Sequence, residues 1–508
     1  MGSNSQKPTL CYVDVGGTFT DAFVVDENGS FVINKASTTP DDTSKGFFNA
    51  LDGVAEKLGM SFEELSTNLK IIGYGATTVL NALLTRKNLA KAGLIVSKGF
   101  EDILLVERGK QTWTDYDRKD RIHVVTHLHQ EPLVPKDLIK GVTERITCRG
   151  DIAIPLYDQE MASAVKELIE SGVDTIVISF LWSFLNTIHE LQAKEIAQKV
   201  VAESGKNIAV ICGTEVSPVI RELPRTNAAI IEATTNPLIR KSFETMNRKL
   251  KENGFGGQLQ IMQSSGGLAA SDKVKAVDTI NSGPVGGLIG GRFIGELYGI
   301  DNIITTDVGG TSFDVGLINN GTIGITRQPT AARMLLGVPQ VEVISVGAGG
   351  GTLAYIDPLT GRLAVGPESA GADPGPVCYD HGGEQPTVTD ADLLLGYLDP
   401  DYFAGGTIKA NLEKAREAMK QKIADPLGIS VIDAAAGIRE IADVLMRQTI
   451  AGLVNARGSS EINDYHLLAF GGGGASHVAG YTQGLPLIGV MVFPYSAVFS
   501  AFGASTSD

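Results

Sequence analysis

Apolar residues near the N-terminus fall in short runs that glycine turns separate. Leu10–Val25 reads LCYVDVGGTFTDAFVV, and Asn28-Gly29 then leads into a third apolar run at Phe31–Ile33. Runs of this length separated by such turns are typical of β-strands joined as hairpins. We therefore expect the chain to open with three antiparallel strands.

The same pattern returns in the middle of the chain. Ile303–Ile318 reads IITTDVGGTSFDVGLI, and Asn320-Gly321 follows it. Both copies spell Asp-Val-Gly-Gly-Thr-x-x-Asp, with Asp14 and Asp21 in the first copy and Asp307 and Asp314 in the second. A repeat of strands, turns and acids together indicates two homologous halves, each opening with a β-hairpin.

Strand and helix patterns alternate in the remaining sequence. Buried strands are expected at Asp174–Leu181, Asn207–Cys212 and the start of Leu467–His477, and helices at Gln159–Ser171, Asn186–Ser204 and Val431–Leu453. This alternation predicts an α/β fold in which helices flank mixed sheets. We expect a first lobe over 8–212, a second lobe over 213–485 and a C-terminal return segment over 486–508.

Composition narrows the function classes. The 508 residues include 43 Lys and Arg against 58 Asp and Glu, a formal net charge of −15, which argues against a nucleic-acid partner because the phosphate backbone needs a basic surface. The four cysteines form no CxxC pair, and the N-terminus MGSNSQKP has no apolar segment of a signal peptide. Pro486, Gly489 and Pro494 interrupt the apolar stretch Leu485–Phe502. These features predict a cytoplasmic protein without a membrane span.

The two hairpin turns suit phosphate binding. A Gly-Gly turn exposes backbone N–H groups without a Cβ in the way, and neighbouring hydroxyls add donors. An aspartate ending the preceding strand, Asp14 or Asp307, can hold Mg2+ directly or through water. The expected phosphate-binding residues are Gly16, Gly17, Thr18 and Thr20 in the first turn, and Gly309, Gly310, Thr311 and Ser312 in the second. A single Gly-Gly turn is normally only a turn, and it is the duplication with identical acids that favours a phosphate clamp.

Three further groups are candidates for function. Gly471, Gly472, Gly473 and Gly474 follow a predicted strand and can let a base and ribose approach the backbone. Asp21 and Asp314 can accept a proton or position water, or instead cap a turn or satisfy a strand end. His123, His127 and His129 share one face if the segment is extended, which suits a substrate or metal site, a polar strand face or a subunit contact.

These motifs together resemble the phosphate-1, phosphate-2 and adenosine motifs of the actin/Hsp70/sugar-kinase ATPase superfamily. More narrowly, the chain resembles the hydantoinase-A/acetone carboxylase β-subunit family. The strings that carry the resemblance are Asp14–Asp21, Ser282–Gly287, Asp307–Asp314, Gly366–Gly371, Thr387–Asp392 and Phe470–Gly474. The resemblance implies a two-lobed actin-like (ribonuclease H-like) fold with a duplicated core and inserted segments, which binds ATP with Mg2+ or Mn2+.

Glu107–Trp113, Asp120–His123, Thr126-His127 and Pro132–Pro135 are similar to the ketone carboxylase branch of that family. Two departures are Tyr74, where many members have histidine, and Gly471–Ala475, which lacks the usual proline. The resemblance implies the ATP-binding subunit of a biotin-independent ketone carboxylase of the acetone or acetophenone type. Such an enzyme phosphorylates the ketone enol, bicarbonate or both, and forms a 3-oxo acid. The alternatives are an ATP-dependent cyclic amide hydrolase and a non-enzymatic ATP-dependent assembly or chaperone module.

The resemblance also implies partner subunits. Relatives continue into a further C-terminal domain, so we expect a small subunit in its place and a large hydantoinase B-like subunit. We expect the small subunit to bury the apolar side chains near the end of the sequence, which would otherwise be exposed to water. These are Val490, Val492, Phe493, Val498, Phe499 and Phe502. The alternative is that these side chains pack within the second lobe.

Overall fold

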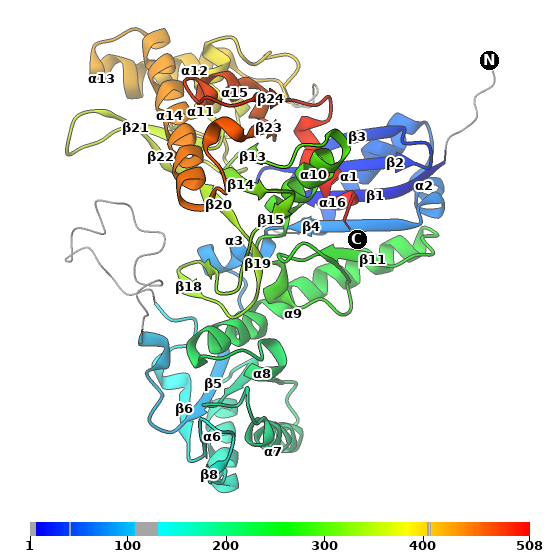
Figure 1. Ribbon diagram of the computed structural model, residues 1–508, viewed down its shortest axis with the longest axis vertical. Coiled ribbons are helices and arrows are strands. Elements are labelled where there is room, and N and C mark those ends of the chain that lie inside the picture. Colours follow the sequence, from blue (N-terminus) through cyan, green and yellow to red (C-terminus); the bar gives the residue numbers. More distant parts are fainter. Residues whose placement is uncertain (1–6, 40–41, 107–130, 404–405, 407, 508) are drawn as a thin grey trace.

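The structure is a computed structural model that describes residues 7–39, 42–106, 131–403, 406 and 408–507. Figure 1 shows two lobes side by side in the upper part of the molecule and a smaller domain below them. Each of the two lobes contains a six-stranded sheet, and the smaller domain contains a four-stranded one.

The first sheet has the order β12-β11-β4-β1-β2-β3. Its strands are β1 (Pro8–Val15), β2 (Phe19–Asp26), β3 (Phe31–Ser37), β4 (Ile71–Ala76), β11 (Leu259–Met262) and β12 (Leu268–Ala270). The first three strands are antiparallel, as predicted, and β4 lies parallel to both β1 and β11. Helices α1 (Thr43–Leu58), α2 (Phe62–Asn68) and α3 (Thr78–Thr85) connect these strands.

The second sheet repeats this arrangement. Its strands are β13 (Ile303–Val308), β14 (Phe313–Asn319), β15 (Thr322–Ile323), β20 (Val343–Val346), β23 (His466–Phe470) and β24 (Gly489–Met491). Antiparallel β13 and β14 correspond to β1 and β2, and parallel β23 and β24 correspond to β4 and β11. The α/β class and the duplicated core predicted from the sequence are therefore confirmed.

The smaller domain is inserted into the first lobe. Its parallel strands are β5 (Ala92–Ser97), β6 (Ile139–Val142), β9 (Thr175–Ser179) and β10 (Ala209–Cys212), and its helices are α6 (Asp158–Glu170), α7 (Ile188–Ser204) and α8 (Gly213–Val216). The short strands β7 (Arg145–Ile146) and β8 (Ile152–Ile154) form a separate hairpin. The elements predicted within 159–212 are present with ends shifted by a few residues.

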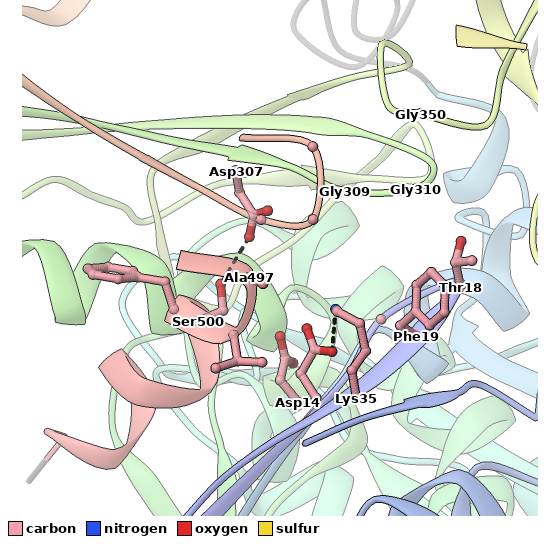
Figure 2. Close-up of a pocket in the computed structure, with 18 of the residues that line it drawn as sticks. Asp14, Thr18, Phe19, Lys35, Asp307, Gly309, Gly310, Gly350, Ala497 and Ser500 are labelled. Carbon is pink, nitrogen blue, oxygen red and sulfur yellow. Dashed lines mark hydrogen bonds and ion pairs between the residues drawn. The ribbon is translucent and has the colours of Figure 1, made fainter. Parts of the chain in front are cut away.

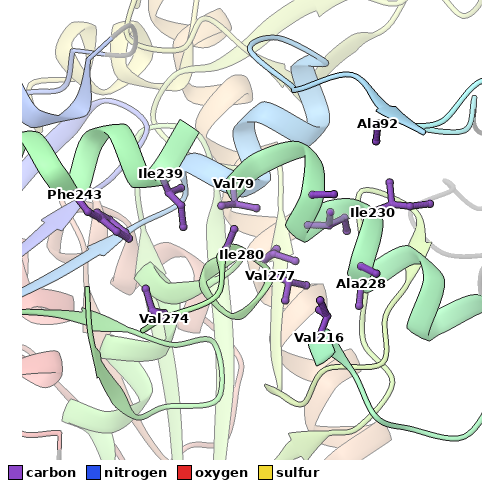
Figure 3. Packing of buried hydrophobic residues seen from close by; sticks show 14 of the residues in the cluster. Val79, Ala92, Val216, Ala228, Ile230, Ile239, Phe243, Val274, Val277 and Ile280 are labelled. Atoms are coloured by element: carbon purple, nitrogen blue, oxygen red, sulfur yellow. The ribbon is translucent and has the colours of Figure 1, made fainter. Parts of the chain in front are cut away.

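The long helix α9 (Glu222–Glu252) joins the inserted domain to the first sheet. Figure 3 shows Ile239 and Phe243 of this helix on the side that faces Ile280, and both side chains are buried with Ile230, Val277 and Ile280 in one apolar cluster. Because β11 and β12 follow α9, the first sheet contains strands that lie after residue 212. The lobe boundaries at 212 and 485 remain predictions from the sequence.

The second lobe carries insertions of its own. Four short strands form two nested antiparallel pairs, in which β16 (Ile325–Thr326) pairs with β19 (Gln340–Val341) and β17 (Thr330–Ala331) pairs with β18 (Met334–Leu335). Strand β21 (Thr352–Ile356) pairs with β22 (Leu363–Ser369). The helices are α11 (Val388–Leu394), α12 (Leu412–Met419), α13 (Asp425–Leu427), α14 (Val431–Arg457) and α15 (Gly474–Thr482). The long helix expected over Val431–Leu453 is α14.

Two helices cross between the lobes, α10 (Ser282–Tyr298) and α16 (Phe499–Ser505). Their glycines permit direct backbone contact, since a Cβ at Gly290 would lie 2.7 Å from the Cα of Gly503. The C-terminal segment is thereby packed against the core: Val498 and Phe499 are buried, and Phe493 and Phe502 pack against the same cluster. Val490 and Val492 remain exposed. Within the described part of the chain, no helix is long and apolar enough to cross a membrane.

Candidate functional site

A cavity of about 900 Å³ lies where the two lobes meet. Figure 2 shows both hairpin turns facing it, with Asp14 and Lys35 on one side and Asp307 on the other. The wall contains Asp14, Gly16, Gly17, Thr18, Asp21, Asp307, Gly309, Gly310, Thr311, Ser312, Asp314, Gly471, Gly472 and Gly473. The fold thus brings most of the predicted site residues together from segments far apart in the sequence.

The two hairpins have the same internal geometry. Asp14 pairs with Asp21 across β1 and β2, and Asp307 pairs with Asp314 across β13 and β14. The first turn is closed by the N–H of Gly16 donating to the carbonyl of Phe19 at 2.9 Å. In the second turn the N–H of Gly309 donates to the carbonyl of Ser312, also at 2.9 Å. Each turn therefore carries two carboxylates at its base.

The hairpin tips contact each other across the cleft. A Cβ added to Gly310 would lie 2.9 Å from the Cβ of Thr18, and one added to Gly17 would lie 3.4 Å from the side chain of Thr311. The Oγ1 of Thr18 is buried and has no hydrogen-bond partner among the described residues. A buried hydroxyl without a partner is costly, so this atom suits a ligand with acceptor oxygens.

A glycine run supports the second hairpin from behind. The N–H groups of Gly350 and Gly351 donate to the carbonyls of Gly309 and Gly310 at 3.0 and 2.6 Å. A Cβ at Gly349 would lie 2.6 Å from the backbone N of Ser312. The run was visible in the sequence as VGAGGGT, but its contact with the hairpin depends on the tertiary fold.

The carboxylates crowd one another in a buried place. Burial and the charges of Asp21 and Asp307 raise the pKa of Asp14 to about 8. Burial and the charge of Asp314 raise the pKa of Asp307 to about 7, against a hydrogen bond that Ser500 donates to its Oδ2 at 3.0 Å. Like charges in low dielectric favour the protonated form. A cation bound between them would relieve this repulsion.

The site fits Mg2+ better than a metal held by protein ligands alone. Among the described residues no three His, Cys, Asp or Glu side chains are arranged to hold a metal. Mg2+ usually takes one or two carboxylates and completes its shell with water and substrate phosphate oxygens. The Oδ1 of Asp14 is buried without a hydrogen-bond partner in the described structure, which leaves it free for such a role.

The third glycine run packs directly on the second carboxylate. A Cβ at Gly471 would overlap the Oδ1 of Asp307 and lie 2.6 Å from the carbonyl O of Val308. Gly471, Gly472 and Gly473 line the cavity, whereas Gly474 begins α15 outside its wall. The cavity wall also contains apolar side chains of the second lobe, those of Tyr379, Leu398, Tyr402 and Phe403.

A buried charged cluster fixes α15 behind this loop. His477 bonds Asp443 through Nδ1 at 2.7 Å and Asp392 through Nε2 at 2.9 Å, and Arg439 pairs with both carboxylates. Burial alone would lower the pKa of His477, but the two carboxylates raise it to about 9. The imidazole is thus held as a cation that balances the cluster.

Removing that imidazole is expected to destabilise the fold. His477→Ala leaves Asp392 and Asp443 facing each other with one cation instead of two, and breaking a buried charge pair costs about 3–5 kcal/mol. Urea unfolding should report the loss, and His381→Ala, which changes an exposed histidine, should cost little. An unfolding midpoint of His477→Ala equal to that of the wild type would exclude a charged role for this histidine.

The stability of the protein should also fall with rising pH when no divalent cation is present. The pKa of Asp14 is 3.8 unperturbed and about 8 in the fold, so the folded state holds this proton more tightly. The resulting stability is present below pH 4 and is lost as the pH rises through 8. We expect a lower melting temperature at pH 8.5 than at pH 6, a smaller difference in Asp14→Asn, and recovery on adding Mg2+. A pH dependence identical in the wild type and Asp14→Asn would contradict the assignment.

Some predicted residues lie elsewhere. The hydroxyl of Thr20 is buried 3.2 Å from that of Thr38, and Thr20 is not among the described residues of the cavity wall. Tyr74 packs edge-on against Phe47 and Phe243 in the core. His123, His127 and His129 lie outside the described residues, as does 107–130 as a whole. Sequence reasoning missed Lys35, whose Nζ lies 2.5 Å from Asp21 Oδ1.

Comparison with known proteins gives two family matches. The Hydantoinase/oxoprolinase model matches residues 225–508, and the Hydantoinase/oxoprolinase N-terminal region model matches residues 11–201. The chain is 41% identical to the acetophenone carboxylase gamma subunit of Aromatoleum aromaticum, covering 98% of this chain and 67% of that one. It is 39% identical to the acetone carboxylase beta subunit of Xanthobacter autotrophicus, covering 98% and 69%.

Solved structures agree with these matches. A nucleotide-free structure of acetone carboxylase superposes with a TM-score of 0.90 at 38% identity, covering 99% of this chain and 70% of that one. The ATP-dependent caprolactamase of Pseudomonas jessenii superposes with a TM-score of 0.81 at 35% identity, covering 97% and 70%. The two-lobed fold predicted from the motifs is confirmed by these superpositions. The chain therefore belongs to the hydantoinase/oxoprolinase family.

Proposed function

We propose that this protein is the ATP-binding subunit of a biotin-independent ketone carboxylase. The observation that carries the proposal is the pair of matching hairpins whose aspartates, Asp14 and Asp307, line one cavity. The chain is 41% and 39% identical to subunits named for acetophenone and acetone carboxylases, and this similarity favours ketone carboxylation as the reaction. The Gly-Gly-Thr turns then hold phosphates, and the loop of Gly471, Gly472 and Gly473 holds the adenosine.

In this proposal Asp14 and Asp307 hold Mg2+ or Mn2+. The metal, when bound, supplies positive charge to the phosphate oxygens. The buried carboxylates supply the anionic oxygens that such an ion requires, and their pKa values are raised by burial and by the mutual repulsion that the ion would relieve. Thr18 and the N–H groups of the two turns orient the phosphate chain. The contact of Thr18 with Gly310 means that the tips must separate for the chain to enter between them.

The acceptor is proposed to be the enol of a ketone, bicarbonate, or both. Neither a ketone α-carbon nor bicarbonate reacts at neutral pH without activation, and phosphoryl transfer provides that activation mainly by positioning and charge neutralisation. Joining the two activated pieces gives a 3-oxo acid without biotin. We propose that this joining takes place with a hydantoinase B-like large subunit and a small subunit, in the cytoplasm. The naming of the relatives as subunits supports an assembly.

A second candidate is an ATP-dependent cyclic amide hydrolase. The caprolactamase subunit alpha of Pseudomonas jessenii is 36% identical over 98% of this chain, nearly as similar as the carboxylase subunits. In that reaction the phosphorylated oxygen would belong to a lactam. The same hairpins would serve both reactions, so the nucleotide site does not discriminate between them.

Phosphate release by the purified complex tests the proposal. Acetone, acetophenone and other ketones are added with and without bicarbonate, and caprolactam and 5-oxoproline are added alone, with formation of the 3-oxo acid measured in parallel. We expect phosphate release to rise when a ketone, bicarbonate or both are added, and not when a cyclic amide is added alone. Stimulation by a cyclic amide alone would favour the second candidate. Ketone-independent ATP hydrolysis with peptide binding would contradict both.

A further inference from the structure

The duplicated hairpins differ at the position opposite their second aspartate. On the first sheet, Asp21 of β2 pairs with Lys35 of β3. On the second sheet, Asp314 of β14 pairs with Ser345 of β20, whose hydroxyl bonds the carboxylate. One half of the repeat therefore has a cation where the other has a neutral hydroxyl. The two repeats therefore differ in charge at a position that, in the first repeat, lines the cavity.

Lys35 is positioned by its neighbours. Its Nζ lies 2.5 Å from Asp21 Oδ1 and 5.1 Å from the centre of the Phe19 ring, and its side chain is 19% exposed. Figure 2 shows it beside Asp14, with its nitrogen directed toward the carboxylates of the first hairpin. An ammonium has three donors, and the contact with Asp21 uses one of them. Lys35 can therefore hold Asp21 and a second anionic group together.

The other cations in the cavity wall are engaged elsewhere. Among the described residues that line it, Lys57 donates to the carbonyl of Ile33 at 2.9 Å, and His477 is saturated by two carboxylates. Lys35 instead pairs with Asp21, which lies opposite Asp14 on the neighbouring strand. It is therefore the described lysine that acts on the centre of the site.

The two lobes contribute different kinds of residue to the cavity wall. The glycine loop at Gly471 and the apolar wall at Tyr379 and Phe403 belong to the second lobe. A nucleoside held there directs its phosphate chain toward the first lobe. The first lobe contributes Lys35 to the wall, together with Asn34 of the same strand and Gly53 and Glu56 of α1. The first lobe thus places Lys35, with Asp14 and Asp21, on the wall that the terminal phosphate and its acceptor would meet.

We propose that Lys35 binds the anionic oxygen of the phosphoryl acceptor and that Asp21 positions its ammonium. This inference rests on the proposed function. The acceptor that Lys35 binds is a small oxyanion, either bicarbonate or an enolate. Such an acceptor approaches four carboxylates and a polyphosphate, so a fixed cation must offset the repulsion. In the transfer, a bond forms between the acceptor oxygen and phosphorus. The bond from that phosphorus to the nucleotide oxygen breaks, and its electron pair stays on the nucleotide.

The test compares Lys35→Met and Lys35→Arg in the assembled complex. Lys70→Met is the matched control, because it removes a lysine of the same lobe that pairs with Glu27 at the surface. Affinity for a fluorescent ATP analogue and the kcat and KM values for bicarbonate and for ketone are measured separately. We expect Lys35→Met to lower kcat/KM for the oxyanion acceptor about 100-fold while nucleotide affinity changes less than about threefold, because the acceptor loses a charge-assisted contact and the nucleotide does not. Lys35→Arg should restore part of the loss.

The measurements distinguish a wrong role for Lys35 from a wrong function for the protein. Comparing bicarbonate with ketone shows which oxyanion depends on Lys35. Nucleotide affinity that falls in parallel with turnover would place Lys35 on the ATP phosphates and overturn the proposal. A wild-type complex that responds to neither ketone nor bicarbonate counts against the proposed function. A normal wild-type response that survives Lys35→Met counts against the role of Lys35 alone.

Discussion

Asp307→Asn is expected to reduce ATP turnover about 100-fold to 1,000-fold while leaving the protein folded. Asparagine has nearly the size of aspartate and can still accept the hydrogen bond that Ser500 donates to this side chain. The asparagine side chain carries no charge. The metal ion that neutralises the phosphate chain would therefore lose one of its two proposed carboxylate ligands. Phosphate release by the complex measures the effect, and circular dichroism with thermal melting checks the fold.

Asp14→Asn should have a comparable effect, because the two aspartates occupy equivalent positions in the two hairpins. Asp272→Asn is the control, since that exposed carboxylate accepts a bond from Gln258 far from the cavity. If both cavity variants keep wild-type turnover, the phosphate-clamp assignment is wrong. Loss in only one of them would assign the metal to a single hairpin.

The hairpins could be predicted from the sequence because the information is local. Each one is a contiguous run of strand, Gly-Gly turn and strand, and the second copy identifies the residues that matter. Lys35 was within reach by the same reasoning. The Asn28-Gly29 turn fixes how β2 pairs with β3, and the observed pairing of Val25 with Phe31 puts Lys35 opposite Asp21. The corresponding Ser345 was out of reach, since β20 joins β14 only after an insertion.

The charged cluster behind the glycine loop shows the opposite case. Arg439 and Asp443 are four residues apart on α14, so their contact follows from helix geometry. Asp392 and His477 come from α11 and α15, and only the packing of these helices brings them to α14. Periodicity describes which face of a helix is buried and does not specify its partner. For this reason His477 could not be told apart from an ordinary residue at a helix start.

The glycines of Ser282–Gly287 were part of a recognised motif whose physical reason appears only in the fold. Helix α10 crosses α16 with its backbone in direct contact, and Gly286 and Gly290 face Gly503. A Cβ at Gly503 would overlap the carbonyl O of Gly286 and lie 2.6 Å from the N of Gly290. These are backbone atoms inside a helix, so they cannot move aside as a flexible side chain would.

Gly503→Val is therefore expected to destabilise the protein by about 3 kcal/mol or more, because overpacking of this kind forces the two helices apart. The effect should reach the site as well, since α16 carries the Ser500 that bonds Asp307. Urea unfolding measures the loss of stability. Gly452→Ala is the matched control: it lies inside α14, and a Cβ there meets nothing within 4 Å. That substitution should be neutral or stabilise by up to about 1 kcal/mol, because alanine favours the helix. Equal stability of Gly503→Val and the wild type would mean that the helices do not cross in contact.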